Sequence, residues 1–409
     1  MRYVIVGNGP AAVGCIEAIR RKDTEGTITL FSKEAEHTYS RPLISYLLEG
    51  KTDEKRMRYR GPDFYRENGV DVRLGVEATA VDPQTHTVTG SDGSTAVYDK
   101  LLLATGGRPF VPPAEGLETV AYNTFMTLAD ARKLEAALTR ESRVLIVGAG
   151  LIGMKCLEGI RHLVREAAVV DLAPQILASI LDPEAAAMVQ AHVEKQGVTF
   201  YLGNSVTRYA PGEALLRSGE TIPFDVLVMA VGVRPETTLA MSMGLDAARG
   251  IPTDERGETA IPGVYAAGDC AISHDITTGK DRVLALLPNA YMQGERCGEA
   301  MSGAEVEEVR SLPMNSMGLF GLHMITAGVL EGESHIRREN GSYKRLCTQD
   351  DRLMGYILVG DVERAGIYTS LIRDQVPLHT LDFALMLEKP QLMAFSKRDR
   401  QIRLGGQRL

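Results

Sequence analysis

The sequence predicts an α/β protein, and three observations support this fold class. One order of elements occurs twice: an apolar strand, a glycine-rich turn and a helix, followed by a hairpin-like stretch and a second apolar strand. The 409 residues suffice for two or three domains, since a domain usually holds ~100–200 residues. Many of the 41 glycines stand in tight loops beside apolar strands, where the backbone can approach a ligand closely. We therefore expect two Rossmann-like domains.

The first copy opens with the strand RYVIVG and the turn GNGPAA. In such a turn the first glycine permits a tight bend, the second admits a pyrophosphate, and the third small residue lets helix and strand pack closely. The stretch HTVTGSDGSTAVYD, with Asp92-Gly93 as its turn, predicts a hairpin before the next apolar strand. The dinucleotide contacts expected in this copy are Gly7, Gly9, Pro10, Ala11, Ala12, Ala104, Thr105 and Gly106.

The second copy opens with the strand SRVLIVG and the turn GAGLIG. A shorter hairpin, LLRSGETIPFD, and the apolar strand VLVMAVG follow in the same order. One glycine-rich turn is weak evidence, but two at strand-to-helix junctions with matching sequels indicate two dinucleotide sites. The contacts expected here are Gly148, Gly150, Leu151, Ile152, Gly153, Ala230, Val231 and Gly232.

An acidic residue about 20 positions after each turn would bond the adenosine ribose. In the second copy this residue is Asp171, which would favour NADH because the additional phosphate of NADPH would meet a carboxylate. Asp171 could instead be a capping residue. In the first copy the candidate is Glu34, although Lys33 holds the more usual position along the chain.

A third signature sets the order of the cofactors. The stretch TAIPGVYAAGD, residues 259–269, resembles the second FAD motif of flavoproteins with two dinucleotide domains, and it contains Gly268 and Asp269. Because this stretch follows the second copy, the first domain must be interrupted. We expect an FAD-binding domain over residues 1–113 and 242–305, with an NAD(H)-binding domain, residues 114–241, inserted between the two parts.

Together these motifs resemble the pyridine nucleotide-disulfide oxidoreductase superfamily, in particular its rubredoxin reductases, nitrite reductase flavin portions and NADH oxidases. Further marks are YSRP, LLLATGGRP, AVGVRP and LPNAYMQG. The resemblance implies a glutathione-reductase-like arrangement and a C-terminal α+β interface domain over residues 306–409. It also implies FAD contacts by Arg41, Pro42, Arg108, Pro288, Asn289 and Ala290.

The sequence departs from this family at two informative places. Disulfide-reducing members carry a redox cysteine near residues 40–48, where this chain reads SRPLISYLL, so electrons should leave from the flavin itself. Many relatives pair a Glu after the third glycine with a Lys beside the flavin. Lys155 and Tyr46 hold these two positions here, so a cation could favour the anionic reduced flavin. Lys155 could instead be a solvated helix residue.

The expected function is an FAD-dependent NADH:acceptor oxidoreductase that delivers electrons to a small acidic carrier of the rubredoxin or iron–sulfur type. The alternatives are an NADH oxidase acting on oxygen or small acceptors, and a slow-turnover redox-sensing flavoprotein. The C-terminal segment, residues 389–409, is basic. This basic tail could steer the carrier or could be merely a solvated end. Against a single acid, Asp399, this tail holds Lys389, Lys397, Arg398, Arg400, Arg403 and Arg408.

Composition limits the remaining possibilities. The net charge of −8 argues against a nucleic-acid partner. No stretch approaches the ~18 apolar residues of a membrane span, and no targeting segment precedes the first apolar strand, so we expect a cytoplasmic protein. The five cysteines form no C-x-x-C pair, so we expect no metal site and buried reduced thiols. A homodimer is a possibility that the resemblance suggests.

Overall fold

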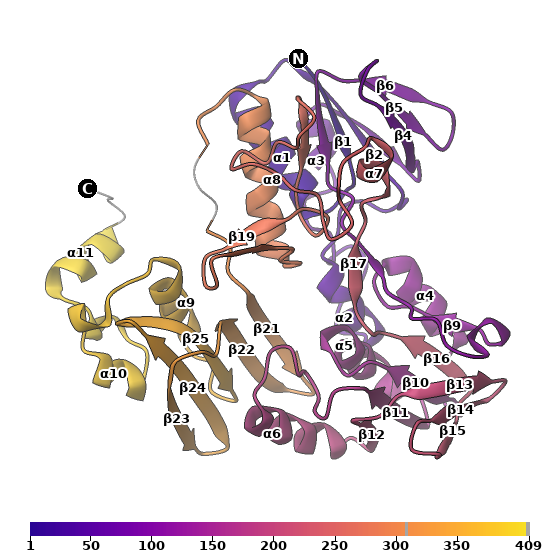
Figure 1. The fold of residues 1–409 in the computed structure, drawn as a ribbon, viewed down its shortest axis with the longest axis vertical. Coiled ribbons are helices and arrows are strands. Elements are labelled where there is room, and N and C mark those ends of the chain that lie inside the picture. The colour runs from indigo at the N-terminus through magenta and orange to yellow at the C-terminus, as the bar shows by residue number, and fades with distance from the viewer. Residues whose placement is uncertain (307–309, 406–409) are drawn as a thin grey trace. The chain divides into compact units, whose positions relative to one another are not determined.

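The computed structural model describes residues 1–306 and 310–405. The chain forms two compact units, whose elements Figure 1 labels along the chain. Unit 1 comprises Met1–Val170, Ser205–His274 and Lys280–Ser311. Unit 2 comprises Asp171–Asn204, Asp275–Gly279 and the described residues from Leu312 onward. The predicted α/β fold with a C-terminal α+β domain is confirmed, whereas the predicted domain boundaries stay a prediction.

The first sheet is parallel, in the strand order β18-β7-β1-β2-β3. Tyr3 and Ile5 pack into one core, while Val4 and Val6 pack into another, because successive residues of a strand point to opposite faces. Burial on both faces explains the unbroken apolar runs in the sequence. The strands are β1 (Arg2–Val6), β2 (Thr27–Ser32), β3 (Val70–Leu74), β7 (Lys100–Leu103) and β18 (Val264–Ala266).

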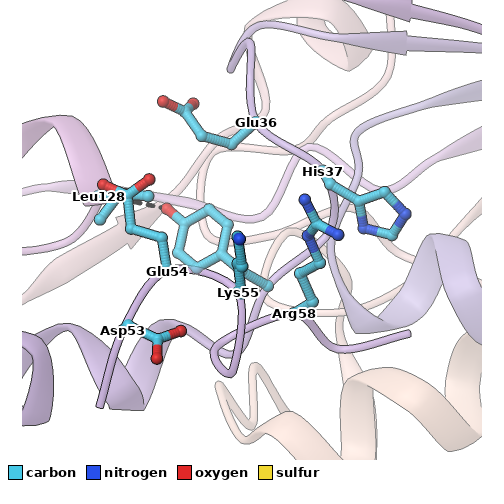
Figure 2. Close-up of a pocket in the computed structure, with 8 residues that line it drawn as sticks. Glu36, His37, Asp53, Glu54, Lys55, Arg58 and Leu128 are labelled. Atoms are coloured by element: carbon cyan, nitrogen blue, oxygen red, sulfur yellow. Dashed lines mark hydrogen bonds between the residues drawn. The ribbon is translucent and has the colours of Figure 1, made fainter. Parts of the chain in front are cut away.

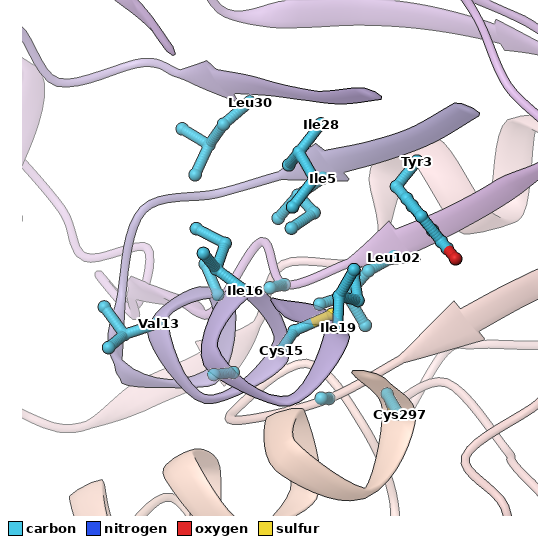
Figure 3. Close-up of a cluster of buried hydrophobic side chains, with 14 of the residues drawn as sticks. Tyr3, Ile5, Val13, Cys15, Ile16, Ile19, Ile28, Leu30, Leu102 and Cys297 are labelled. Atoms are coloured by element: carbon cyan, nitrogen blue, oxygen red, sulfur yellow. The ribbon is translucent and has the colours of Figure 1, made fainter. Parts of the chain in front are cut away.

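Two helices lie side by side on this sheet: α1 (Pro10–Lys22) and α8 (Leu287–Met301). Figure 3 shows the core that α1 builds with the strands. Glycine permits the contact between the helices, since a Cβ at Gly294 would lie 1.9 Å from the carbonyl oxygen of Ala11, and a Cβ at Gly14 would lie 2.4 Å from that of Tyr291. The two helices are therefore pressed together along their backbones.

The second five-stranded sheet has the order β12-β11-β10-β16-β9, and its central strand β10 (Arg143–Val147) is parallel to both neighbours. The other strands are β9 (Tyr122–Asn123), β11 (Glu166–Asp171), β12 (Val198–Leu202) and β16 (Val226–Met229). The associated helices are α4 (Leu128–Ala137), α5 (Leu151–Ile160) and α6 (Pro183–Glu194). The sequence repeat thus corresponds to two parallel sheets of one design.

Both predicted hairpins form, and each belongs to a three-stranded antiparallel sheet. The first holds β4 (Ala78–Asp82), β5 (Thr87–Gly90) and β6 (Thr95–Val97), and the second holds β13 (Val206–Ala210), β14 (Glu213–Leu216) and β15 (Thr221–Pro223). The strands β8 (Gly107–Pro109) and β17 (Val233–Pro235) pair with each other. Short elements are α2 (Ile44–Leu48), α3 (Phe64–Glu67), α7 (Thr238–Ser242), β19 (Ser273–Asp275) and β20 (Lys280–Arg282).

The C-terminal sheet of unit 2 is antiparallel, in the order β21-β22-β25-β24-β23. Its strands are β21 (Met314–Leu319), β22 (Leu322–Gly328), β23 (Glu333–Glu339), β24 (Ser342–Gln349) and β25 (Arg352–Val359). The helices α9 (Ala365–Arg373) and α10 (Phe383–Glu388) contribute to the core of this sheet, and α11 (Lys397–Gly405) follows. None of the helices within residues 1–306 and 310–405 is long and apolar enough to cross a membrane.

Candidate dinucleotide-binding sites

The two glycine-rich turns have nearly the same geometry. Gly7 has φ = 112° and donates its N–H to Phe31 O at 2.9 Å, whereas Gly148 has φ = 116° and donates to Val170 O at 2.7 Å. A Cβ at Gly7 would lie 2.0 Å from Ala104 O, and one at Gly148 would lie 2.3 Å from Ala230 O. Only glycine fits both positions, because positive φ and close backbone contact act together.

Each turn leads into a helix whose first N–H groups have no side-chain cap. Gly9 is the N-cap of α1 and Gly150 is the N-cap of α5, and a Cβ at either residue would meet nothing within 4 Å. By contrast, Thr127 caps α4 and Asp182 caps α6 through their side chains. Uncapped N–H groups and the positive end of the helix dipole thus face open space, which fits a diphosphate at each turn.

The third signature comes together with the first turn. The N–H of Gly268 donates to Gln293 Oε1 at 2.8 Å, and a Cβ at Gly268 would contact the Cβ atoms of Ala11 and Ala290. The helix α8 also starts without a side-chain cap, and Pro288 stands in its first turn. Asn289 and Ala290 are both buried there. Gln293, which the sequence reasoning did not single out, therefore links the YAAGD and LPNAYMQG motifs.

Arg41 of unit 1 interacts with two acidic residues, Glu34 and Asp269. Arg41 forms an ion pair with Glu34, and Tyr39 donates its hydroxyl to Glu34 Oε2 at 2.5 Å. Burial raises the pKa of the Asp269 carboxyl, while the charge of Arg41 opposes that shift. Lys33 instead pairs with Glu77, and its side chain is 74% exposed. The geometry therefore favours Glu34 over Lys33 as the inward-facing residue.

The backbone that follows β7 and the backbone that follows β16 also leave room for a ligand to approach closely. Gly106 has φ = 73° and Gly232 has φ = 125°, and a Cβ at either would meet no atom within 4 Å. Thr105 donates its hydroxyl to the carbonyl oxygen of Glu236 at 2.5 Å. Arg108 lies 3.5 Å from the carboxylate of Glu236 and is 61% exposed. Thr105 and Gly106 stand beside the paired strands β8 and β17.

Asp171 is the last residue of β11, as expected from the sequence. The residue before it, Val170, pairs with Val147, which directly precedes Gly148. The Oδ1 atom of Asp171 accepts the N–H of Ala173 at 2.7 Å, so Asp171 takes part in a local turn. Its role toward NADH stays a prediction.

Lys155 and Tyr46, which are far apart in sequence, lie in contact. The Lys155 ammonium is 4.3 Å from the centroid of the Tyr46 ring, and its side chain is only 18% exposed. The reading of Lys155 as a solvated helix residue therefore does not fit the structure. Lys155 also forms an ion pair with Glu158, whose side chain is 3% exposed. A buried carboxylate is thus present one turn beyond the position that the family motif uses.

A pocket of about 640 Å³ lies beside the YSRP segment (Figure 2). The hydroxyl of Tyr39 accepts the N–H of Leu128 at 2.9 Å at its margin. Two of its acids, Glu36 and Glu54, are held by Arg132 at 2.7 Å each. The lining contains none of the residues predicted from the sequence; it consists of Glu36, His37, Tyr39, Asp53, Glu54, Lys55, Arg58 and Leu128.

The five cysteines are free and buried, as expected. Burial raises the pKa of Cys15, Cys156, Cys270 and Cys297, which keeps these thiols protonated and poorly nucleophilic. The segment from the YSRP motif through α2 contains no cysteine.

Two glycine turns of one geometry, each before an uncapped helix, are typical of NAD(P)H-dependent flavoprotein oxidoreductases, the class to which this protein belongs. The chain belongs to the pyridine nucleotide-disulphide oxidoreductase family, whose model matches residues 1–294. This family implies binding of FAD and NAD(P)H. Residues 313–376 match the rubredoxin NAD+ reductase C-terminal domain.

Known proteins resemble the chain over most of its length. The epsilon subunit of NADH-dependent phenylglyoxylate dehydrogenase from Aromatoleum evansii is 33% identical, with 93% of each chain covered. The nitrite reductase [NAD(P)H] of Bacillus subtilis is 30% identical over 92% of this chain, which spans about half (48%) of that protein. The putidaredoxin reductase in its covalent complex with putidaredoxin has a TM-score of 0.85 and 23% identity, over 99% of this chain and 98% of that one. The last likeness shows the fold.

Proposed function

We propose that this protein oxidises NADH at the Gly148 turn and passes the electrons, through FAD held at the Gly7 turn, to an electron-carrier protein. When bound, FAD supplies a hydride acceptor that can later release single electrons. The chain contributes binding and orientation. The backbone at Gly7 and Gly9 admits one diphosphate and that at Gly148 and Gly150 the other.

The flavin would be held by residues that converge in unit 1. Glu34 would bond the adenosine ribose, Arg41 would balance the diphosphate charge, and Asp269 would accept a hydrogen bond from the ribityl chain. The ion pair between Arg41 and Glu34 and the charge effect of Arg41 on Asp269 support this assignment. The N-terminus of α8, which contains Pro288, would face the flavin ring with the positive end of the helix dipole.

The single observation that carries the choice of acceptor is the missing thiol. The residues after the YSRP motif hold no cysteine, and the five cysteines elsewhere are buried. Electrons therefore need another exit than a protein dithiol, and a carrier that approaches the flavin directly provides one. The match of residues 313–376 to the C-terminal domain of rubredoxin reductases supports a rubredoxin-type or iron–sulfur carrier.

A second candidate is an NADH-oxidising subunit of a larger dehydrogenase. The observation in its favour is the relative from Aromatoleum evansii, which is named as one subunit of an NADH-dependent enzyme and is covered over 93% of its length. In that case the carrier would be an iron–sulfur subunit of the same complex. Purification of the protein from its native source with its bound partners would distinguish the two candidates.

Anaerobic rapid mixing tests the proposal. NADH should bleach the flavin absorption. A panel of rubredoxins and ferredoxins with matched reduction potentials should then restore the absorption in single-electron steps. Fast reoxidation by oxygen with none by carriers would favour an NADH oxidase. Slow flavin reduction by NADH, even with an artificial dye as acceptor, would favour a redox sensor and would contradict the proposed activity.

We predict that Asp171 gives a preference for NADH over NADPH. Discrimination between the two nucleotides by a polar contact at the ribose is worth ~1–3 kcal/mol, or roughly ten- to a hundredfold in kcat/KM. Asp171→Ser should lower the ratio of kcat/KM for NADH to kcat/KM for NADPH, chiefly by improving the use of NADPH. Steady-state kinetics with both nucleotides give the measurement. Equal kcat/KM values for the two nucleotides in the unchanged protein would refute the assignment.

A further inference from the structure

The pocket beside the YSRP segment of unit 1 contains two cations without a carboxylate partner. Lys55 and Arg58 line this pocket of about 640 Å³ (Figure 2). Within residues 1–306 and 310–405, neither of the two side chains forms an ion pair. Sites for small molecules usually occupy ~300–1,000 Å³, so the pocket has a suitable size. Its lining therefore offers uncompensated positive charge to a small ligand.

The acids of the same lining already have cationic partners. Glu36 and Glu54 each lie 2.7 Å from Arg132, which stands on α4. Asp53 pairs with Arg56 at 2.8 Å and accepts the backbone N–H of Arg56 at 2.9 Å. Neither of these arginines belongs to the lining. The lining acids are thus engaged by neighbouring arginines, and the charges of the two lining cations remain available to an anion.

The segment that carries both cations, between α2 and α3, is fixed by its backbone. Met57, which lies between Lys55 and Arg58, is buried, and its carbonyl oxygen accepts the N–H of Ser40 at 2.9 Å. Arg58 forms an isolated antiparallel bridge with Tyr39. Side chains of residues opposite each other in such a bridge extend from the same face. The backbone of the two cations is therefore in place before a ligand arrives.

The two kinds of lining group fit a ligand with two kinds of polar group. Ammonium and guanidinium groups bind phosphate oxygens through charge-assisted hydrogen bonds. The carboxylates of Glu36 and Glu54 can accept hydrogen bonds from hydroxyl groups, because an ionised carboxylate has about four acceptor positions and the contacts with Arg132 use only some of them. The same carboxylates would repel a second anionic group.

We propose that this pocket binds a phosphate monoester that carries free hydroxyl groups. The phosphate lies at Lys55 and Arg58, and the hydroxyl groups face Glu36 and Glu54. This inference goes beyond the proposed function, since no residue of the lining is assigned to FAD or NADH. Because both cations are exposed, solvent and salt screen them, and the affinity should fall as salt is added.

Isothermal titration calorimetry of the FAD-loaded protein at low salt tests the proposal. An excess of NAD+ fills the second dinucleotide site, so that a phosphate compound cannot bind there. The probe is ribose 5-phosphate, and inorganic phosphate and ribose represent its two parts. We expect ribose 5-phosphate to bind and each part to bind at least about tenfold more weakly. AMP binding more tightly than ribose 5-phosphate would assign the site to nucleotides, and weaker binding would assign it to sugar phosphates.

Three variants locate the binding site. Lys55→Gln and Arg58→Gln should each weaken the binding of ribose 5-phosphate by about three- to tenfold. Both side chains are exposed, so neither substitution should disturb the fold. The matched control is Lys133→Gln, which removes an exposed cation next to Arg132 but outside the lining. This control should leave the affinity unchanged.

Several results would overturn the proposal. One is the absence of binding of ribose 5-phosphate at millimolar concentration, and another is binding that neither Lys55→Gln nor Arg58→Gln weakens. Equal weakening by Lys133→Gln would show attraction by the net charge alone. Inorganic phosphate that binds as tightly as ribose 5-phosphate would exclude a contribution of Glu36 and Glu54 to recognition.

Discussion

Gly7 and Gly9 stand two residues apart in one turn, yet a methyl group would meet different surroundings at each. At Gly7 it would lie 2.0 Å from Ala104 O on a backbone with φ = 112°. At Gly9 it would meet nothing within 4 Å. At the scale of single residues, the structure therefore separates a glycine needed by the fold from a glycine that leaves room for a ligand.

We predict that Gly7→Ala destabilises the flavin-free protein, whereas Gly9→Ala does not. Strain at a positive φ costs ~1–3 kcal/mol, and the clash with Ala104 adds to it. Gly9→Ala should instead weaken FAD binding, since the methyl group would occupy the space in front of α1. Thermal unfolding without flavin and flavin titration measure the two effects. Wild-type FAD affinity in Gly9→Ala would contradict this division.

Asp269 gives a prediction that depends on pH. Burial raises the pKa of its carboxyl, although Arg41 opposes the shift. A raised pKa in the folded state means that the ionised group costs stability at neutral pH. This cost disappears as the pH falls through the raised value toward the ordinary value near 3.8.

Asp269→Asn should therefore stabilise the flavin-free protein at pH 7, and its advantage should shrink steadily as the pH falls toward 4. The same variant should bind FAD more weakly, because the acceptor for the ribityl chain is lost. Chemical unfolding of both proteins across this pH range gives the comparison. An advantage that grows on acidification would show that the sign is wrong.

At the scale of elements, α6 is tied to the C-terminal sheet within unit 2. Asp182 caps α6 through the N–H of Ala185 at 2.9 Å and accepts the hydroxyl of Tyr343 at 2.7 Å. Arg345 donates to the same carboxylate at 2.9 Å. The nearby pair of Glu184 and Arg338 is more exposed, with 45% of the Glu184 side chain accessible. The buried contact should therefore matter more than the exposed one.

We predict that Asp182→Ala lowers the thermal stability far more than Glu184→Ala. Loss of the cap costs ~0.5–2 kcal/mol, and removal of the acceptor for the Tyr343 hydroxyl and for one N–H of Arg345 adds ~1–3 kcal/mol. The exposed pair of Glu184 and Arg338 is screened by solvent, so Glu184→Ala should change the midpoint of thermal unfolding little. Differential scanning calorimetry measures both variants. Equal effects would mean that Asp182 contributes no more than a surface charge.

Asp182 also contributes a pH dependence. Burial opposes its ionisation, but the hydrogen bonds from Tyr343, the N–H of Ala185 and Arg345 outweigh burial and lower its pKa. A lowered pKa contributes stability above the ordinary value of 3.8 that is lost as the pH falls through the folded value. Asp182→Asn should therefore flatten the acid limb of the stability curve.

At the scale of the whole molecule, the basic tail is the feature expected to meet a carrier. Lys389 is already paired with Glu363 at 3.1 Å, whereas Lys397 and Arg398 are exposed on α11. Arg403 has no described side chain, and Arg408 lies outside the described residues. The cations that could steer an acidic partner are therefore concentrated after Ser396, on a chain of net charge −8.

We predict that deletion of residues 396–409 slows the reduction of an acidic carrier but not that of a neutral quinone. Electrostatic steering acts on the association rate and is screened over ~10 Å at 0.1 M salt, so the difference should vanish as salt is added. Stopped-flow measurements of carrier reduction and of quinone reduction at several ionic strengths test this prediction. Unchanged carrier kinetics and salt dependence in the truncated protein would exclude docking by the tail.

The local elements of this fold could be predicted from the sequence alone. The glycine turns, both hairpins and the strand that ends at Asp171 could be predicted because their signals lie within a few neighbouring residues. A positive φ, a type of turn and an alternation of buried residues are properties of short segments. The family resemblance and the absence of a thiol after the YSRP motif could likewise be seen in the sequence.

The contacts between side chains that are distant in sequence became visible in the three-dimensional fold. Lys155 and Tyr46 are brought together by the contact of α2 with α5, Gln293 of α8 accepts the N–H of Gly268, and Asp182 accepts the hydroxyl of Tyr343. Such partners leave no periodicity in the sequence, because their spacing depends on how elements pack. The sequence therefore identified Lys155 as unusual, whereas the buried carboxylate that holds it became visible only in the fold.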